Sequence, residues 1–173
     1  MANVREVRKA DDPILRKKAK EVTNFSDPLL KQLAEDMAET MYQAPGVGLA
    51  APQIGVSKRV LVADCGEEAG GLHVLINPKI ISQEGTQIGL EGCLSFPNLY
   101  GDVERAEKVV VKAQDLSGRR FKLEATGLLS RCFQHEIDHL NGILFVDKAT
   151  NLREMKPEDF KKEREVSETA KAL

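Results

Sequence analysis

The sequence has few cysteines, no long apolar run and almost no net charge. Its 173 residues include three cysteines, an odd number that cannot pair completely into disulfides. No segment reaches the roughly 18 uninterrupted apolar residues that span a bilayer, and the N-terminus, MANVREVRKADDP, has no apolar stretch of signal-peptide type. The net charge of -2 gives no bulk attraction to nucleic acid. We therefore expect a cytoplasmic protein with reduced thiols that binds neither DNA nor a membrane, or an organellar one if a targeting segment precedes this sequence.

The composition is that of an ordinary folded protein, with 42% apolar and 30% charged residues. This length fits a single domain with one core, which we expect to cover residues 1–173. We interpret Cys65 as a small buried apolar residue.

Helix signals lie at both ends of the chain. Asp12-Pro13 and Asp27-Pro28 each predict a helix start, and the second helix should run to about residue 43 and stop at Pro45-Gly46. Its apolar residues recur at helical spacing, namely Leu29, Leu30, Leu33, Met37 and Met41. The charged segment after Pro157 predicts a C-terminal helix, which we interpret as a solvated tail.

The middle of the chain predicts antiparallel strands rather than alternating strand–helix units. After a glycine-rich loop or extended stretch at residues 46–55, short β-type runs occupy residues 59–64, 72–76, 108–113 and 120–125. His73 lies in one of these runs and is interpreted as a strand or surface residue. A long helix follows, with Thr126 as its cap and Asn141-Gly142 as its end.

The strongest chemical signal is His135-Glu136-Ile137-Asp138-His139 on this helix. Residues four apart lie on one helix face, so the two histidines can bind one metal ion, and Glu136 can reach a water on that metal. At about 100° per residue, the helix sorts into a metal face, a core face and a polar face. An HxxxH pair placed by chance would show no such sorting; the alternative is two helical histidines that merely pack or cap.

A catalytic zinc-type site needs a third protein ligand and an open position for water. No histidine follows His139, and the acidic residues after it lie in charged, surface-like sequence. Upstream, Cys93 stands in the mostly apolar segment EGCLSFP. Alone it would be a buried small residue or a nucleophile; beside this helix we interpret it as the third ligand, because a thiolate binds soft or borderline metals strongly.

Three segments now stand in order: GVGLAAPQIG (46–55), EGCLSFP (91–97) and QHEIDHLNG (134–142). Together they resemble the three motifs of the peptide deformylase family, and the resemblance extends over nearly the whole chain. It implies an α+β fold in which antiparallel β-strands pack around a central metal-binding helix, with N-terminal helices and a C-terminal helix. Tyr100 stands where some bacterial relatives carry a basic residue, a departure that affects only the rim of the substrate groove.

The resemblance also implies the site. Cys93, His135 and His139 would hold one divalent metal, with Fe²⁺ the usual ion and Zn²⁺, Ni²⁺ or Co²⁺ able to replace it. Glu136 would be the catalytic acid and base, and the reacting carbonyl oxygen would be bound by the side chain of Gln53 and the backbone N–H of Leu94. The substrate would be a formyl-methionyl peptide, hydrolysed to release formate, and the ribosome with its nascent chain is the partner this implies. Without the resemblance, Gln53 is better read as a loop residue bonded to its own backbone.

The substrate side of the site is expected on the same helix face. Leu128 and Cys132 share the face of the two histidines and, with Val47, are placed to line an apolar pocket for a methionine side chain. Arg131 lies just around the helix and would mark the rim of that pocket. Gly48, a turn residue otherwise, would let the backbone approach an extended peptide and pair with it.

Two alternatives differ from this hypothesis in their chemistry. A zinc peptidase of the HExxH type would cleave ordinary peptide bonds and would need a third His or Glu ligand. A protein with a structural metal would need a fourth protein ligand and would leave Glu136 without a role.

Overall fold

The computed structural model describes residues 1–165. Its helices are α1 (Pro28–Gln43), α2 (Gly127–Leu140) and α3 (Pro157–Glu165), with short 3-10 helices at Pro13–Arg16, Ala51–Ile54, Glu67–Ala69 and Phe145–Asp147. The strands are β1 (Gly48–Ala50), β2 (Val60–Asp64), β3 (Leu72–Glu84), β4 (Gln87–Cys93), β5 (Phe96–Arg105), β6 (Lys108–Gln114), β7 (Arg120–Thr126) and β8 (Thr150–Glu154).

Both predicted N-terminal helix starts are confirmed. The side chains of Asp12 and Asp27 accept hydrogen bonds from the backbone N–H two residues later, and a proline follows each of them in the first turn. Helix α1 ends at Gln43, as expected. Of its predicted apolar residues, Leu29 is the exception, since it is exposed and stands outside the buried stripe.

The strands form two antiparallel sheets. The larger has the order β1-β2-β3-β6-β7 and the smaller the order β4-β5-β8. The predicted α+β class with antiparallel strands is therefore confirmed. The four predicted strands all occur in the larger sheet, and the predicted loop at residues 46–55 contains β1 and a 3-10 helix.

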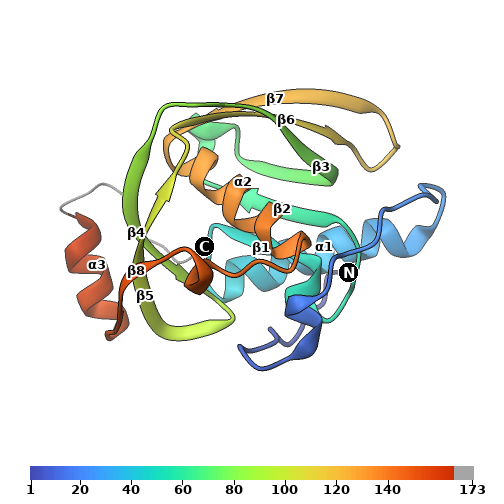
Figure 1. The fold of residues 1–173 in the computed structure, drawn as a ribbon. Coiled ribbons are helices and arrows are strands. Elements are labelled where there is room, and N and C mark those ends of the chain that lie inside the picture. Colours follow the sequence, from blue (N-terminus) through green and yellow to red (C-terminus); the bar gives the residue numbers. More distant parts are fainter. Residues whose placement is uncertain (166–173) are drawn as a thin grey trace.

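Helices α1 and α2 cover opposite faces of the larger sheet. In β2, Val60 and Val62 belong to the apolar cluster that includes the buried residues of α1. Leu61 and Ala63, which alternate with them, belong to the cluster that includes the core residues of α2. Helix α2 consequently lies in the middle of the molecule, with the smaller sheet at its side (Figure 1).

Several sequence predictions fail in detail. Strands β4, β5 and β8 were not expected, and the side chain of Thr126 makes no capping bond although the residue occupies the cap position of α2. Cys65 is only partly buried. The C-terminal helix is confirmed as far as Glu165, and residues 166–173 lie outside the described part. No helix within residues 1–165 has the length and apolar character needed to cross a membrane.

Candidate metal centre and active site

Helix α2 presents His135 and His139 one turn apart on a buried face. Both side chains are about 1% exposed, and their ring centroids are 5.0 Å apart. Cys93 ends β4 and reaches the same place from the smaller sheet, with its Sγ 3.3 Å from His139 Nε2. One donor atom from each of the three residues lies within 4.8 Å of the others. The structure thus brings together the three residues that the sequence predicted as ligands.

The chemistry and the unsatisfied atoms of this cluster fit a metal ion. His135 Nε2 is buried and has no hydrogen-bond partner among residues 1–165. Buried polar atoms are almost always bonded, so such an atom indicates an absent partner. Burial also lowers the pKa of His139 well below its usual value, which keeps this imidazole neutral as a ligand must be. One sulfur and two imidazole nitrogens are donors that suit iron or zinc.

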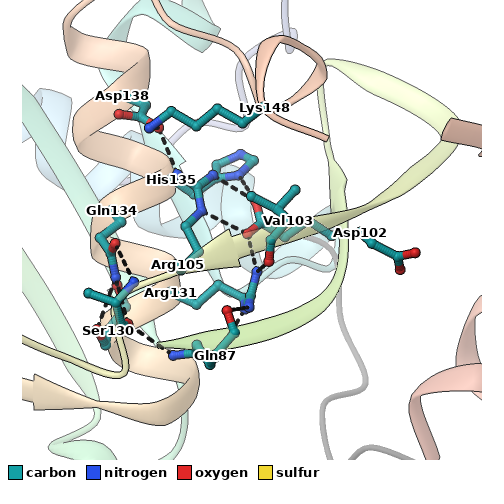
Figure 2. Close-up of polar contacts among 12 residues, drawn as sticks. Gln87, Asp102, Val103, Arg105, Ser130, Arg131, Gln134, His135, Asp138 and Lys148 are labelled. Carbon is teal, nitrogen blue, oxygen red and sulfur yellow. Dashed lines mark hydrogen bonds and ion pairs between the residues drawn. The ribbon is translucent and has the colours of Figure 1, made fainter. Parts of the chain in front are cut away.

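Glu91 orients His135 from behind. Its Oε1 accepts a hydrogen bond from His135 Nδ1 at 2.8 Å and from Arg105 Nη2 at 2.8 Å. Burial alone would raise the pKa of Glu91, but the hydrogen bonds from Arg105 and His135 outweigh it and hold this pKa well below its usual range. An ionised carboxylate only accepts, so Nδ1 carries a hydrogen, and Nε2 is the nitrogen of His135 that would bind a metal. Figure 2 shows His135, Arg105 and Arg131 converging between α2 and the strands of the smaller sheet.

Glu136 lies beside the ligands and is fully buried. Both of its carboxylate oxygens have no hydrogen-bond partner within the described chain. Burial raises its pKa to about 7, which is suited to a group that takes and returns a proton near neutral pH. Gly48 makes room for this carboxylate, because a Cβ at Gly48 would lie 2.4 Å from Glu136 Oε2 and 2.6 Å from Cys132 Sγ.

Gln53 makes the local backbone bond expected of a loop residue and also reaches the Cys93 side chain. Its Oε1 accepts from the backbone N–H of Ala50 at 2.9 Å, the local bond expected of a loop residue. Its Nε2 donates to Ser95 Oγ at 3.1 Å and lies 3.6 Å from Cys93 Sγ. The local bond thereby fixes the amide so that its N–H groups face the metal ligands.

A groove of about 890 Å³ reaches the cluster at Cys93 and Leu94. Its walls come from the N-terminal segment, the end of α1, the smaller sheet and α3, and include Val7, Pro45, Phe96, Tyr100 and Phe160. The rings of Tyr100 and Phe160 stack with their centroids 4.1 Å apart. The tail expected to be solvated therefore packs through Phe160 and forms part of the groove wall.

The three residues predicted to hold a methionine side chain lie close together, and Gly48, predicted to admit the peptide backbone, lies beside them. Cys132 Sγ approaches Val47 O at 3.5 Å, Gly48 abuts Cys132, and Leu128 packs against the core cluster that contains Val47 and Cys132. None of the four lines the 890 Å³ groove. A hydrogen bond with Cys65, then burial, raises the pKa of Cys132 well above its usual value, so it remains a neutral thiol.

Arg131 does not mark an exposed rim. It is only 4% exposed, and its guanidinium is directed at Glu91 and Gln87 in β4. Ser130 and Gln134, on the polar face of α2, are likewise buried. Ser130 Oγ donates to Ala106 O at 2.9 Å, and the Gln134 side chain accepts from the Ala106 N–H and donates to Ala106 O. His73, in contrast, is the strand residue expected, with Nε2 2.7 Å from Ala69 O.

Sequence reasoning missed Glu91 and Arg105. Glu91 begins the segment EGCLSFP. A carboxylate two residues before a candidate ligand, in a mostly apolar stretch, could have been predicted to bond that ligand set. Arg105 offered no local signal, because its bond to Glu91 depends on the pairing of β4 with β5.

Comparison with known proteins identifies the family. Residues 4–155 match the family model described as polypeptide deformylase. A peptide deformylase of Caldicellulosiruptor bescii is 58% identical over 145 residues, which cover 84% of this chain and 85% of that protein. The crystal structure of the Thermotoga maritima peptide deformylase has a TM-score of 0.81 and 45% identity, covering 86% of this chain and 99% of the other. An Acinetobacter baumannii peptide deformylase with bound Met-Ala-Ser has a TM-score of 0.81 and 40% identity, with the same coverage. The chain belongs to the peptide deformylase family, whose members are metal-dependent enzymes that remove N-terminal formyl groups.

Proposed function

We propose that this chain hydrolyses the formyl group of formyl-methionyl peptides at a single divalent metal bound by Cys93, His135 and His139. The observation that carries the proposal is the convergence of these three donors, within 4.8 Å of one another, at the end of a groove large enough for a peptide. We propose Fe²⁺ as the metal, with Zn²⁺, Ni²⁺ and Co²⁺ as substitutes. Held by these three residues, the metal would act as a Lewis acid that makes water a nucleophile near neutral pH.

The protein's own groups would then move the proton and stabilise charge. Glu136 would take a proton from the attacking water and pass it to the leaving amine, as the formyl carbon–nitrogen bond breaks and formate is released. Its buried carboxylate and its pKa of about 7 support this role. Negative charge develops on the formyl oxygen, and the Gln53 amide with the Leu94 N–H would donate to it. The position of Gln53 Nε2 near Cys93 supports this assignment.

The peptide would lie in the groove beside Cys93 and Leu94. Its methionine side chain would extend past the metal ligands to contact Val47, Leu128 and Cys132, which do not line that groove, and Gly48 would allow backbone approach. The bound Met-Ala-Ser of the Acinetobacter relative supports a substrate of this length. Since such substrates are newly made chains, we propose that the enzyme acts in the cytoplasm close to the ribosome.

The test is formate release from formyl-Met-Ala-Ser beside hydrolysis of unformylated Met-Ala-Ser. We expect formate from the first peptide and no cleavage of the second. Glu136→Gln should abolish formate release with the metal retained, whereas Glu67→Gln, on an exposed turn, should match the parent. Cleavage of internal peptide bonds without formate release would instead favour an HExxH peptidase.

A further inference from the structure

Arg131 is a buried cation without a role in the reaction above. It lies on α2, one turn before the ligand His135, and is 4% exposed. Burying a charge is costly unless it is paired and hydrogen-bonded, so its partners indicate what it does.

All the partners of this guanidinium lie on the smaller sheet. Nη1 donates to Glu91 Oε2 and, at 3.0 Å, to Val103 O, and Nε donates to Gln87 Oε1 at 3.2 Å. Figure 2 shows the side chain leaving α2 and extending between Gln87 and Val103. Arg131 thus bridges the helix that supplies two metal ligands to the strand that supplies the third.

Gly89 gives this bridge its space. It lies between Gln87 and Glu91 in β4, and a Cβ there would be 3.1 Å from Arg131 Nη2 and 3.2 Å from Cζ. These separations are tighter than ordinary van der Waals contact. A side chain at Gly89 and the present position of the guanidinium therefore compete for the same volume.

Apolar packing does not provide an equivalent link. The core residues of α2, such as Phe133 and Leu140, belong to the cluster formed with the larger sheet. Cys93 belongs to a separate small cluster with Val103 and Phe145. At the metal site, α2 and β4 are therefore joined largely by buried polar contacts, among which those of Arg131 and Glu91 are central.

Arg131 and Arg105 hold Glu91 differently. Arg105 divides its charge between Glu91 and Asp138, whose Oδ2 it contacts at 2.7 Å. Among residues 1–165, the only ion pair of Arg131 is with Glu91, at the Oε2 atom. The opposite oxygen of Glu91 holds His135 Nδ1.

We propose that Arg131 is a positioning residue of the metal site. By holding Glu91 and β4 against α2, it sets the location of Cys93 relative to His135 and His139 and keeps His135 Nε2 directed at the metal. The inference rests on the metal-binding role proposed for these three residues.

The experiment measures metal binding rather than turnover. The apoprotein and its Arg131→Met variant are titrated with Co²⁺ in competition with a chelator, and the thiolate-to-cobalt absorption band is recorded. Loss of a group that orients a metal ligand typically costs about 10–100-fold in affinity, and we expect a loss of that size with a shifted band. Arg131→Lys should recover part of the affinity, because an ammonium can reach Glu91 but cannot reproduce the planar fork.

A double-mutant cycle tests the route through Glu91. If Arg131 acts through this carboxylate, Arg131→Met should weaken Co²⁺ binding much less in a Glu91→Gln background than in the parent. An equal loss in both backgrounds would overturn the proposal, as would an Arg131→Met variant whose affinity stays within twofold of the parent with an unchanged band.

Two further variants separate positioning from general stability. Leu33→Ala creates a cavity in the α1 cluster, to which none of the three ligands belongs, and should lower the melting temperature with no change in Co²⁺ affinity. Gly89→Val keeps the arginine but displaces its guanidinium, and should weaken Co²⁺ binding as Arg131→Met does. If Arg131→Met does not fold, unchanged affinity in folded Gly89→Val refutes the proposal. Formate release by the parent is assayed separately, so absent deformylase activity would count against the proposed function alone.

Discussion

Replacing Gly48 by alanine should disable the proton-transfer group without removing the metal. The added Cβ would lie 2.4 Å from Glu136 Oε2 and 2.6 Å from Cys132 Sγ, whereas ordinary contacts begin near 3.4 Å. The carboxylate oxygen must therefore retreat by about 1 Å if the backbone holds its place. The backbone is held on one side, because Gly48 in the edge strand β1 pairs with Ala63 of β2.

A displacement of about 1 Å from productive geometry can reduce a rate by about 10²-fold. Complete loss of general acid–base catalysis would extend the reduction to about 10⁴-fold. We therefore expect Gly48→Ala to lower kcat for formyl-Met-Ala-Ser by 10²–10⁴-fold while one metal ion per protein is retained. Formate release and metal analysis on the same sample measure both quantities.

The control is Gly66→Ala. Gly66 has a φ of +101° and nothing within 4 Å of its would-be Cβ, so alanine there introduces backbone strain without touching the site. We expect a destabilisation of about 1–3 kcal/mol with kcat unchanged. If Gly48→Ala keeps kcat within threefold of the parent and raises only KM, Gly48 serves substrate approach alone, and the steric argument about Glu136 is wrong.

Four further outcomes follow from the site. Alanine at Cys93, His135 or His139 should each abolish stoichiometric metal binding, and a Cys93→Ala variant with one tight metal and full activity would exclude the assigned ligand. Burial raises the pKa of Glu136 from an ordinary 4.5 to about 7. This group thus stabilises the metal-free fold below pH 4.5, and the contribution, up to roughly 3 kcal/mol, is lost as the pH rises through 7. In denaturant titrations between pH 5 and 8, the free energy of unfolding should decrease less with rising pH in Glu136→Gln than in the parent. In air, the Fe²⁺ enzyme should lose activity with oxidation of Cys93 and not of Cys132, as followed by peptide mass spectrometry, and the Ni²⁺ enzyme should persist. The ratio of kcat/KM should favour formyl-Met over formyl-Ala, since each buried methylene contributes about 0.8 kcal/mol, and equal values would exclude an apolar pocket.

The parts of the fold that the sequence predicts correctly are those with local signals. Helix α1 has a capping aspartate, a proline in its first turn and a stripe of apolar residues, so its bounds could be predicted. The histidine pair of α2 depends only on helical spacing. Strands β2 and β6 contain valine runs typical of strands, and β2 reads as a continuous apolar run because it is covered on both faces.

The smaller sheet has no such signals. β4 contains Gly89 and Gly92, β5 contains a proline and Asn98 in the left-handed region, and β8 is short and polar. Their extended state follows from pairing with one another rather than from propensity. The expectation of one domain over residues 1–173 stays a prediction.

The same difference between local signals and long-range contacts explains which site residues could be predicted from the sequence. His135 and His139 come from one local pattern, and Cys93 was added because two histidines leave a catalytic site incomplete. Glu91 and Arg131 are 40 residues apart and meet only because β4 lies beside α2. Before that contact is known, only the angle of Arg131 on the helix, just around from the histidine face, is available, and that angle predicts a residue at the pocket rim.

The location of the metal site follows from how the two sheets are joined. Helix α2 packs its apolar face on the larger sheet, and its remaining face meets the smaller sheet, where Gly89 has no side chain and leaves space for the Arg131 guanidinium. Charged side chains fill this interface, and buried charges hold a fixed geometry only when each is paired. A metal site built there, as proposed, obtains two ligands from α2 and one from the smaller sheet, together with a set of buried hydrogen bonds that orients them. Its geometry consequently depends on Glu91 and Arg131 as much as on the ligands themselves.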